Sequence, residues 1–173
     1  TLTASLRGAE PGEGFLGGGP GWKTRIGFPR GKQDWTRFGD TFHTAKDQTR
    51  FELMILTESK TDGFDIDAIQ LEEGRQRTPF EQGMLPGEMT VQSVPADDAG
   101  FGVNLIPNPS FETVDGVRPK HWVWDARNTE STFDIIRGGR SGNTAIQITN
   151  GTPTGPHVYG QLVLLGGLRL EPD

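Results

Sequence analysis

The sequence predicts an all-β protein folded as a β-sandwich of two antiparallel sheets. Short apolar runs recur about every ten residues and are separated by turns, which is typical of sandwich strands. Glycine, proline and small polar residues fill the turns, with 25 glycines and 12 prolines among 173 residues. No stretch of about eleven residues or more shows the 3.6-residue period of an amphipathic helix.

Composition narrows the classes of function. The net charge of −6 and the pI near 5.1 disfavour a nucleic-acid partner, because binding phosphates requires clustered cations and the 17 lysines and arginines are scattered. The absence of cysteine excludes disulfides, thiolate metal sites and cysteine nucleophiles. No apolar run approaches the roughly 18 residues of a membrane span. Thr1 opens inside a strand pattern without a signal sequence, so we expect a part of a larger multidomain protein.

The first half is predicted to hold five strands. Thr1–Gly8 alternates, with its apolar residues on one face. Residues 50–57 form the most apolar run and are predicted to be a central strand buried on both faces. The alternation of Gly63–Glu72 puts Asp65, Asp67, Ile69 and Leu71 on one side. The five predicted strands are residues 1–8, 23–28, 34–44, 50–57 and 63–72.

Two features of the first half depart from simple strands. The glycine-rich stretch Glu10–Gly21 is predicted to be a long surface loop of the kind that borders binding sites. In residues 34–44 the aromatics Trp35, Phe38 and Phe42 break strict alternation, so a bulge near Gly39 is expected if all three are buried.

The second half follows a predicted linker. Residues 75–103 are poor in apolar residues, apart from one possible strand at Met89–Val94. Asn104–Thr113 reads as an opening strand, confined to an edge or a bulged course by its two prolines. Further strands are predicted at residues 122–125, 132–137, 144–149 and 157–165.

Several segments together carry a family resemblance. N-L-I-P-N-P-S-F-E at 104–112, followed by P-K-H-W at 119–122, resembles the opening of the β-jelly-roll carbohydrate-binding modules of the group that includes families 4, 9 and 22. T-L-T-A-S-L-R-G at 1–8 is similar to the middle of such a module. D-W-T-R-F at 34–38, F-E-L-M-I-L at 51–56 and F-D-I-D-A-I-Q-L-E-E-G at 64–74 resemble its end. The resemblance implies a jelly roll.

The halves of the module stand in reverse order. Residues 1–74 correspond to its C-terminal half and residues 104–173 to its N-terminal half. The chain is therefore expected to be a circular permutation, or a piece cut from mid-module to mid-module of a tandem array. A linker of about 30 residues reaches on the order of 30 Å, so we expect the halves to pair within one chain as one domain. Pairing between chains, in a domain-swapped dimer, is the alternative.

The resemblance also implies a structural calcium ion. Its matching ligands are Asp67, Glu112 and the loop around Ser141, with Asp65 a weaker candidate. Calcium takes six to eight oxygen ligands, and carboxylates from distant segments could pin the sandwich together. In the alternative interpretation Asp67 caps a strand end and Glu112 is a solvated edge residue.

For glycan binding, exposed aromatic side chains must stack on sugar rings beside polar groups. Trp22 follows the glycine-rich stretch, and Trp124 and Tyr159 lie in later strands, whereas the resemblance makes Trp35 and Trp122 core residues. The expected ligand-binding residues are Trp22, Trp124, Tyr159, Arg7, Arg25 and Gln161, with Glu52 and Gln147 as further polar candidates.

Catalytic constellations are weak. Asp65 and Asp67 are neighbours on one strand, whereas glycosidase carboxylates flank the substrate from different elements. His157 with Tyr159 is the one pair that a polysaccharide lyase could use. We therefore expect no enzyme but a module that targets a larger secreted or cell-surface protein to polysaccharide or oligosaccharide. A structural or adhesion sandwich without a glycan ligand is the first alternative, and a lyase is the second.

Overall fold

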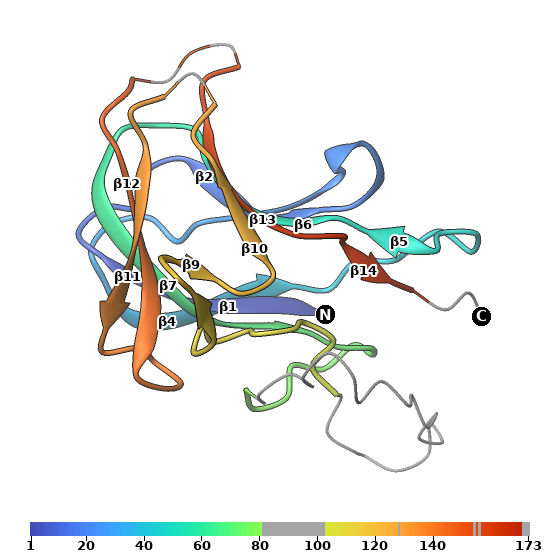
Figure 1. Ribbon diagram of the computed structural model, residues 1–173. Coiled ribbons are helices and arrows are strands. Elements are labelled where there is room, and N and C mark those ends of the chain that lie inside the picture. Colours follow the sequence, from blue (N-terminus) through green and yellow to red (C-terminus); the bar gives the residue numbers. More distant parts are fainter. Residues whose placement is uncertain (81–102, 128, 154, 156, 171–173) are drawn as a thin grey trace.

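The protein is a β-sandwich of two five-stranded antiparallel sheets (Figure 1). The computed structural model describes residues 1–80, 103–127, 129–153, 155 and 157–170. None of these segments forms a helix long and apolar enough to cross a bilayer. The predicted β-sandwich is confirmed.

Sheet A has the strand order β11-β12-β7-β1-β4. Its strands are β11 (Thr132–Arg137), β12 (Thr144–Asn150), β7 (Thr61–Leu71), β1 (Leu2–Gly8) and β4 (Gln33–Asp40). Sheet B has the order β10-β13-β6-β2-β3. Its strands are β10 (Trp122–Asp125), β13 (Gly160–Leu164), β6 (Leu53–Thr57), β2 (Gly14–Gly18) and β3 (Thr24–Gly27).

Shorter elements complete the fold. The 3-10 turn η1 (Pro20–Trp22) connects β2 to β3. A two-stranded ribbon of β5 (Arg50–Phe51) and β14 (Leu168–Arg169) projects from one end of the sandwich (Figure 1). A second ribbon joins β8 (Val114–Asp115) to β9 (Arg118–Pro119).

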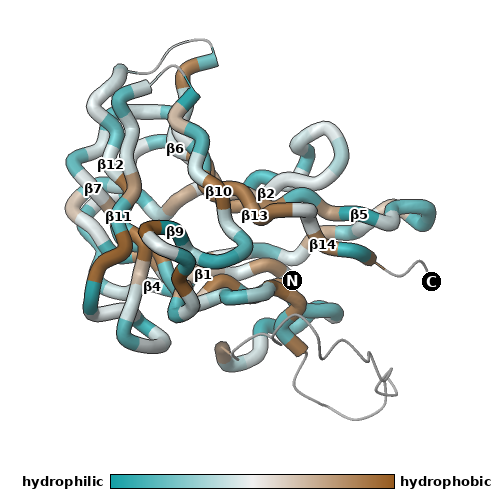
Figure 2. Tube along the Cα trace, in the orientation of Figure 1, coloured by the Kyte–Doolittle hydropathy of each residue, from teal (hydrophilic) through white to brown (hydrophobic). Residues whose placement is uncertain are grey.

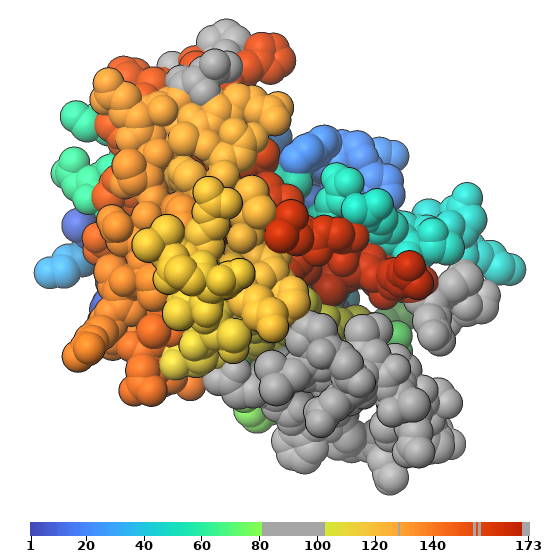
Figure 3. Space-filling model, in the orientation of Figure 1, coloured from blue at the N-terminus to red at the C-terminus, as the bar shows by residue number. Residues whose placement is uncertain are grey.

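Each sheet combines two adjacent strands of the second half with three adjacent strands of the first half, and the two groups meet at one strand pair. In sheet A, Ile146 of β12 lies opposite Ile66 of β7. In sheet B, Leu162 of β13 lies opposite Ile55 of β6. The space-filling view likewise places the red segment around β13 and β14 against the cyan segment around β5 (Figure 3). In this structure β12 and β13 of the second half thus pair with β7 and β6 of the first. Most of the predicted linker, including the possible strand at 89–94, lies outside the described residues.

The core lies between the inner faces of the two sheets. Leu2, Ala4 and Leu6 of β1 are fully buried, as their alternation predicts. Leu16 and Ile55 meet them from sheet B in one apolar cluster. Apolar positions also run along the neighbouring β10 and β13 (Figure 2). Burying each large aliphatic side chain stabilises the fold by about 1.5–3 kcal/mol.

The central position predicted for the apolar run is confirmed. All five residues of β6 are buried, and β6 lies between β13 and β2 in sheet B. The predicted strand is interrupted at the exposed Glu52, which separates β5 from β6.

The prediction of a structureless loop at residues 10–21 was wrong. The segment 10–21 contains β2, which pairs with both β6 and β3. A Cβ on Gly17 would lie 2.0 Å from Thr24 O, and one on Gly18 would lie 1.8 Å from Glu52 O. These glycines therefore let three strands approach closely, rather than leaving the segment without structure.

The predicted opening strand at 104–113 was also wrong. Pro107 and Pro109 lack the N–H groups that a ladder needs, and the segment is irregular. The Asn104 side chain replaces part of the ladder: its Nδ2 donates to Ile69 O at 2.9 Å, and its Oδ1 accepts from Leu71 N at 3.2 Å. The segment is thereby fastened to β7.

A bulge interrupts the alternation predicted for β7. Thr3 pairs with Gln70 but Ser5 pairs with Asp67, so β7 holds one extra residue there. Ala68 adopts a φ of 54°, in the left-handed region. Because of this extra residue, Ile69 and Leu71 point into the core and not to the face of Asp65.

The three aromatic residues of segment 34–44 lie in different environments. Phe38 is in the core, whereas Trp35 is half-buried and is not the core residue that the resemblance implied. Phe42 lies beyond the end of β4 and stacks on Phe51, with ring centroids 5.1 Å apart. Gly39 of β4 pairs with Thr3 of β1 without a register shift. The shift between these two strands lies at Leu6–Gly8, so the bulge is not near Gly39.

Candidate functional site

The outer face of sheet B carries an apolar cluster of its own. Phe15, Met54 and Leu56 point away from the sandwich core yet are at most 5% exposed. Tyr159 and Val163 pack against them. The Arg25 guanidinium lies over Phe15, 4.2 Å from the ring centroid. A cation over an aromatic ring is favourable, and here it covers the ring on its solvent side.

Two adjacent depressions lie on this face and share Glu58 and Tyr159, and we call them together the groove. The first, of about 200 Å³, is lined by Phe15, Trp22, Arg25, Leu56, Glu58 and Tyr159. The second, of about 350 Å³, is lined by Glu13, Glu58, Gly155, His157, Val158 and Tyr159. A continuous surface therefore runs from Trp22 to His157.

Two strained residues border the groove. Trp22 has a φ of 57° and His157 a φ of 58°, both in the left-handed region that is costly for residues with a Cβ. Trp22 ends η1, where its N–H donates to Gly19 O at 3.2 Å, and it is 42% exposed. The fold thus presents a large aromatic side chain to solvent at this rim.

Both arginines in and beside the groove are paired with carboxylates, whereas Glu13 has no ion-pair partner among the described residues. Arg25 contacts Glu58 at 2.7 Å, and Arg127 contacts Asp125 at 3.0 Å. All four side chains are more than a third exposed, so each pair contributes little stability. Their effect is to leave this part of the face close to electrically balanced.

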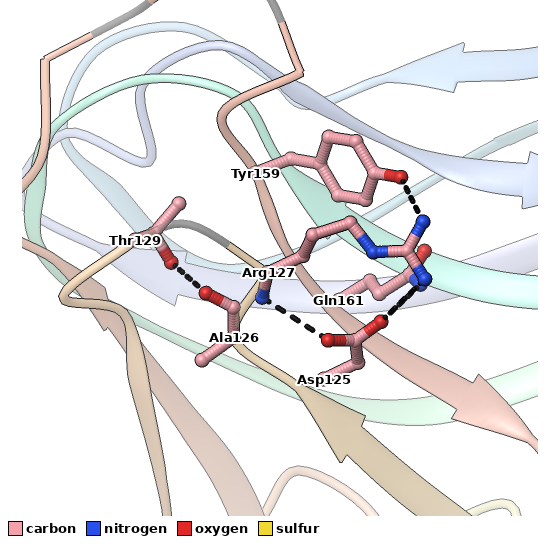
Figure 4. Close-up of polar contacts among 6 residues, drawn as sticks. All are labelled: Asp125, Ala126, Arg127, Thr129, Tyr159 and Gln161. Carbon is pink, nitrogen blue, oxygen red and sulfur yellow. Dashed lines mark hydrogen bonds and ion pairs between the residues drawn. The ribbon is translucent and has the colours of Figure 1, made fainter.

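A polar cluster joins Asp125, Arg127, Tyr159 and Gln161 (Figure 4). Arg127 donates to Tyr159 Oη at 3.1 Å while its other terminal nitrogen donates to Asp125 Oδ2. Gln161 Nε2 donates to the same Asp125 oxygen at 3.2 Å. Tyr159 therefore connects this cluster to the groove.

Four of the six predicted ligand-binding residues share this face: Trp22, Arg25, Tyr159 and Gln161. The other two lie elsewhere. Trp124 belongs to the inner side of β10, where it packs on Phe133 with ring centroids 5.4 Å apart. Arg7 lies on sheet A, donates to Asp65 at 2.6 Å and covers the Trp35 ring at 4.6 Å.

Sequence reasoning missed four residues of this face: Phe15, Glu58, Asp125 and Arg127. Phe15 stands inside the glycine-rich segment that was taken for a loop. Asp125 follows Trp124 directly. Alternation along a strand places neighbouring residues on opposite faces, so only one of the two could be expected on the outer face. Because Trp122 was expected in the core and Trp124 is two residues further along the strand, alternation indicated that Trp124 faces inward and Asp125 outward.

The two residues of the predicted lyase pair lie close together, beside two glutamate side chains. His157 and Tyr159 both line the larger depression, where the other titratable side chains are Glu13 and Glu58. A lyase acting on uronates needs positive charge near the substrate carboxylate. Among the described residues that line this depression there is no lysine or arginine.

The three predicted metal ligands lie at one end of sheet A, beside the loop between β11 and β12. Ser141 donates to Asp67 Oδ2 from its N–H at 2.8 Å and from its hydroxyl at 3.0 Å. Glu112 Oε1 accepts from Thr144 N at 2.8 Å and from Thr144 Oγ1 at 2.7 Å. The glycine-rich loop between β11 and β12 therefore lies between two carboxylates from distant parts of the sequence.

The electrostatics of Asp67 are unusual. Its side chain is fully buried, and burial raises the pKa of its carboxyl, while hydrogen bonds from Ser141, Ala68 and Arg140 oppose the rise. No described cation pairs with it. Across the described part of the chain, no three His, Asp or Glu side chains gather as a metal site. Any cation here would therefore draw on backbone and hydroxyl oxygens besides Asp67 and Glu112.

Comparison with known proteins leaves the family open. No protein-family model matches the sequence, and no curated protein or solved structure matches the chain. The function is therefore argued from the geometry of the groove and of the Asp67 loop.

Proposed function

We propose that this protein is a non-catalytic carbohydrate-binding module that holds a larger secreted or cell-surface protein on polysaccharide. One observation carries the proposal: Trp22 and Tyr159 border the same groove, with Phe15 beneath it. Sugar rings have apolar C–H faces that stack on exposed aromatic side chains, and a groove lined in this way accepts an extended chain of them.

The polar groups support the same ligand class. Arg25, Glu58, Asp125 and Gln161 bring donors and acceptors beside the aromatic surface. Because the groove cations already face carboxylates, the surface suits an uncharged, hydroxyl-rich ligand. Binding of this kind is weak for one module, and it acts by raising the local concentration of the attached protein at its target.

For the architecture, we propose a jelly roll whose two halves stand in permuted order. The pairing of β7 with β12 and of β6 with β13 supports this, because each half supplies strands to both sheets. Neither half has a complete sheet without the other, so the two form one folding unit.

We further propose a structural calcium ion beside Asp67, Glu112 and Ser141. The support is a buried carboxylate without a cation partner, facing a loop that also reaches a second carboxylate. Glu112 Oε2 accepts no hydrogen bond from the described residues and is available as a ligand. The ion would stabilise the loop and take no part in binding.

A structural or adhesion sandwich is the second candidate. The observation that favours it is the mutual pairing of Arg25 with Glu58 and of Arg127 with Asp125, which leaves these charges satisfied without a ligand. The lyase alternative is weaker, because the two arginines beside Tyr159 and Glu58 are each paired with a carboxylate already.

The test is a glycan array together with affinity electrophoresis, each with calcium and with EDTA. The proposal predicts retention on at least one neutral polysaccharide and none on polyuronate. Absence of retention on every polysaccharide would favour the structural sandwich. Cleavage of a uronate polymer, followed by absorbance of the unsaturated product, would establish the lyase.

A further inference from the structure

Three arginine side chains among the described residues share one arrangement. Each guanidinium lies over an aromatic ring and forms an ion pair with a carboxylate. The three units are Arg7 over Trp35 with Asp65, Arg25 over Phe15 with Glu58, and Arg127 over Tyr159 with Asp125. Such a unit puts hydrogen-bond donors and acceptors beside an aromatic surface, the combination that sugar rings with hydroxyls require. The units differ in whether their polar atoms are already occupied.

Both carboxylate oxygens are occupied in two of the units. Asp65 Oδ2 accepts from Arg7 at 2.6 Å, and its Oδ1 accepts from Gln147 Nε2 at 3.1 Å. Asp125 Oδ2 accepts from the Arg127 guanidinium at 3.0 Å, and its Oδ1 accepts from the Arg127 backbone N–H at 3.1 Å (Figure 4). These two carboxylates therefore complete contacts within the protein and have no oxygen left without a donor.

The unit of Arg25 and Glu58 is different. Glu58 Oε1 accepts from Arg25 Nη2 at 2.7 Å, whereas no described residue donates to Glu58 Oε2 or accepts from Arg25 Nε and Nη1. The side chains of Arg25 and Glu58 are 50% and 39% exposed, against 11% for Asp65. A ligand from solution can therefore reach both a free acceptor and free donors at this unit.

This unit also occupies the middle of the groove. Glu58 lines both depressions, and Arg25 lines the smaller one together with Trp22 and Tyr159. The Glu58 N–H donates to Glu13 O at 2.8 Å, which holds the residue after β6 against the start of β2. A sugar ring stacked on Trp22 or Tyr159 therefore has its hydroxyls in the same depression as this unit.

We propose that Arg25 and Glu58 recognise two hydroxyls on adjacent carbons of one sugar ring and determine the specificity of the groove. One hydroxyl accepts from the Arg25 guanidinium while its neighbour donates to Glu58 Oε2, because a hydroxyl can both donate and accept. The proposal rests on glycan binding at the groove and deepens it, since it names the ligand class. That class is a neutral polysaccharide whose internal residues keep an adjacent pair of free hydroxyls.

The linkage between the sugars decides which polysaccharides qualify. In (1→4)-linked xylan, glucan and mannan chains, the hydroxyls on the second and third carbons are free and adjacent. In a linear (1→3)-linked glucan the third carbon carries the linkage, so the internal residues have no adjacent pair on the ring. Such a ligand leaves Arg25 or Glu58 without its partner, and sites built for hydrogen bonding reject ligands that lack the matching group.

A pair of matched variants tests the assignment. E58M keeps the side-chain length but removes both carboxylate oxygens, and E73M makes the same change at the exposed Glu73, beyond the end of β7. The probes are xylan, glucomannan and galactomannan in affinity gels, and the linear (1→3)-β-glucan curdlan in pull-downs. We expect E58M to bind the (1→4)-linked probes about ten-fold more weakly, through loss of a hydrogen bond to a charged group. E73M should bind as the wild type does.

The melting temperature of E58M should stay that of the wild type, because exposed ion pairs contribute little stability. The binding outcomes separate this inference from the function on which it rests. Unchanged binding by E58M, or equal weakening by E58M and E73M, overturns the role of Glu58 and leaves glycan binding standing. Wild-type binding to curdlan alone does the same. Lack of wild-type binding to every probe overturns both.

A measurement on the wild type covers the case in which E58M fails to fold. Titration calorimetry compares laminarihexaose, which is (1→3)-linked, with xylohexaose, cellohexaose and mannohexaose, which are (1→4)-linked. At least one of the (1→4)-linked hexaoses should bind about ten-fold more tightly than laminarihexaose. Equal or tighter binding of laminarihexaose overturns the proposal, and so does lack of binding by all four.

Discussion

Ser141 and Asp67 lie 74 residues apart in the sequence, yet the Ser141 N–H donates to Asp67 Oδ2 at 2.8 Å. The contact joins a strand of the first half to a loop of the second. It depends on the bulge at Ala68, whose own N–H donates to Asp67 Oδ1 at 2.6 Å. A single buried carboxylate thus ties together the two parts of the chain.

Calcium should stabilise the protein, and the gain should depend on pH. Burial raises the folded pKa of Asp67 above its ordinary 3.8, so without metal its contribution to stability increases as pH falls through the folded pKa. A bound cation requires the ionised form, so the gain from calcium should shrink over the same pH range. At pH 7 and a hundred-fold excess over Kd, calcium should raise Tm by about 5–10 °C.

The measurement is calorimetry from pH 7 to pH 4, with calcium and with EDTA. In D67N the calcium gain should disappear at every pH. A Tm that EDTA leaves unchanged at pH 7 would eliminate the calcium site.

Trp22 and Tyr159 should each contribute to glycan affinity. W22A and Y159A are expected to weaken binding about ten-fold, which corresponds to about 1.4 kcal/mol for the loss of one stacking surface. The matched control is W35A, which removes a half-buried tryptophan covered by an arginine on the opposite sheet. If W35A weakens binding and W22A does not, sheet A carries the site.

Gly139 should tolerate no side chain. A Cβ at this position would lie 2.0 Å from Thr144 O and 2.9 Å from Asp67 Oδ2. Because one of these neighbours is backbone, G139A should lower the free energy of unfolding by about 1–3 kcal/mol in urea titrations. At Gly27 nothing lies within 4 Å of an added Cβ, so G27A should change stability by less than about 0.5 kcal/mol.

The Asn104 side chain should contribute strongly to the stability of the fold, because it satisfies two backbone groups of β7. N104A removes the partners of Leu71 N and Ile69 O, both in the buried edge of β7. Leaving these groups unpaired should cost about 2–4 kcal/mol, measured by urea unfolding. N143A, at an exposed position, serves as the control. Equal effects of the two variants would contradict a fastening role for Asn104.

Joining the two halves of the chain in the opposite order should preserve the fold. A chain that begins at Val103, joins Asp173 to Thr1 through a flexible glycine-serine linker and ends at Phe80 retains every described strand. It should fold as a monomer with a Tm within about 5 °C of the original, because new termini at surface positions are tolerated. Size-exclusion chromatography and calorimetry check this. A permutant that folds only as a dimer would indicate exchange of halves between chains.

Local patterns predicted much of the fold. The alternation in β1 and the apolar run of β6 placed both strands and their buried residues correctly. The segment around β2 was missed because its glycines resemble a loop, and only the close approach of Glu52 and Thr24 explains them. In β7 the apolar positions shift from Phe64 and Ile66 to Ile69 and Leu71, which marks the bulge in the sequence. Strict alternation ignored this shift, so the facing of Ile69 was predicted wrongly.

The all-β class, the positions of most strands and the candidate aromatic and carboxylate residues follow from local sequence patterns, because alternation and turn composition are local properties. Which residues share a surface follows from the tertiary structure alone. It separated Trp124 from Tyr159, moved Arg7 to the other sheet, and brought Ser141 to Asp67. Strand order, register and bulges set these relationships through long-range pairing, and no short stretch of sequence contains that information.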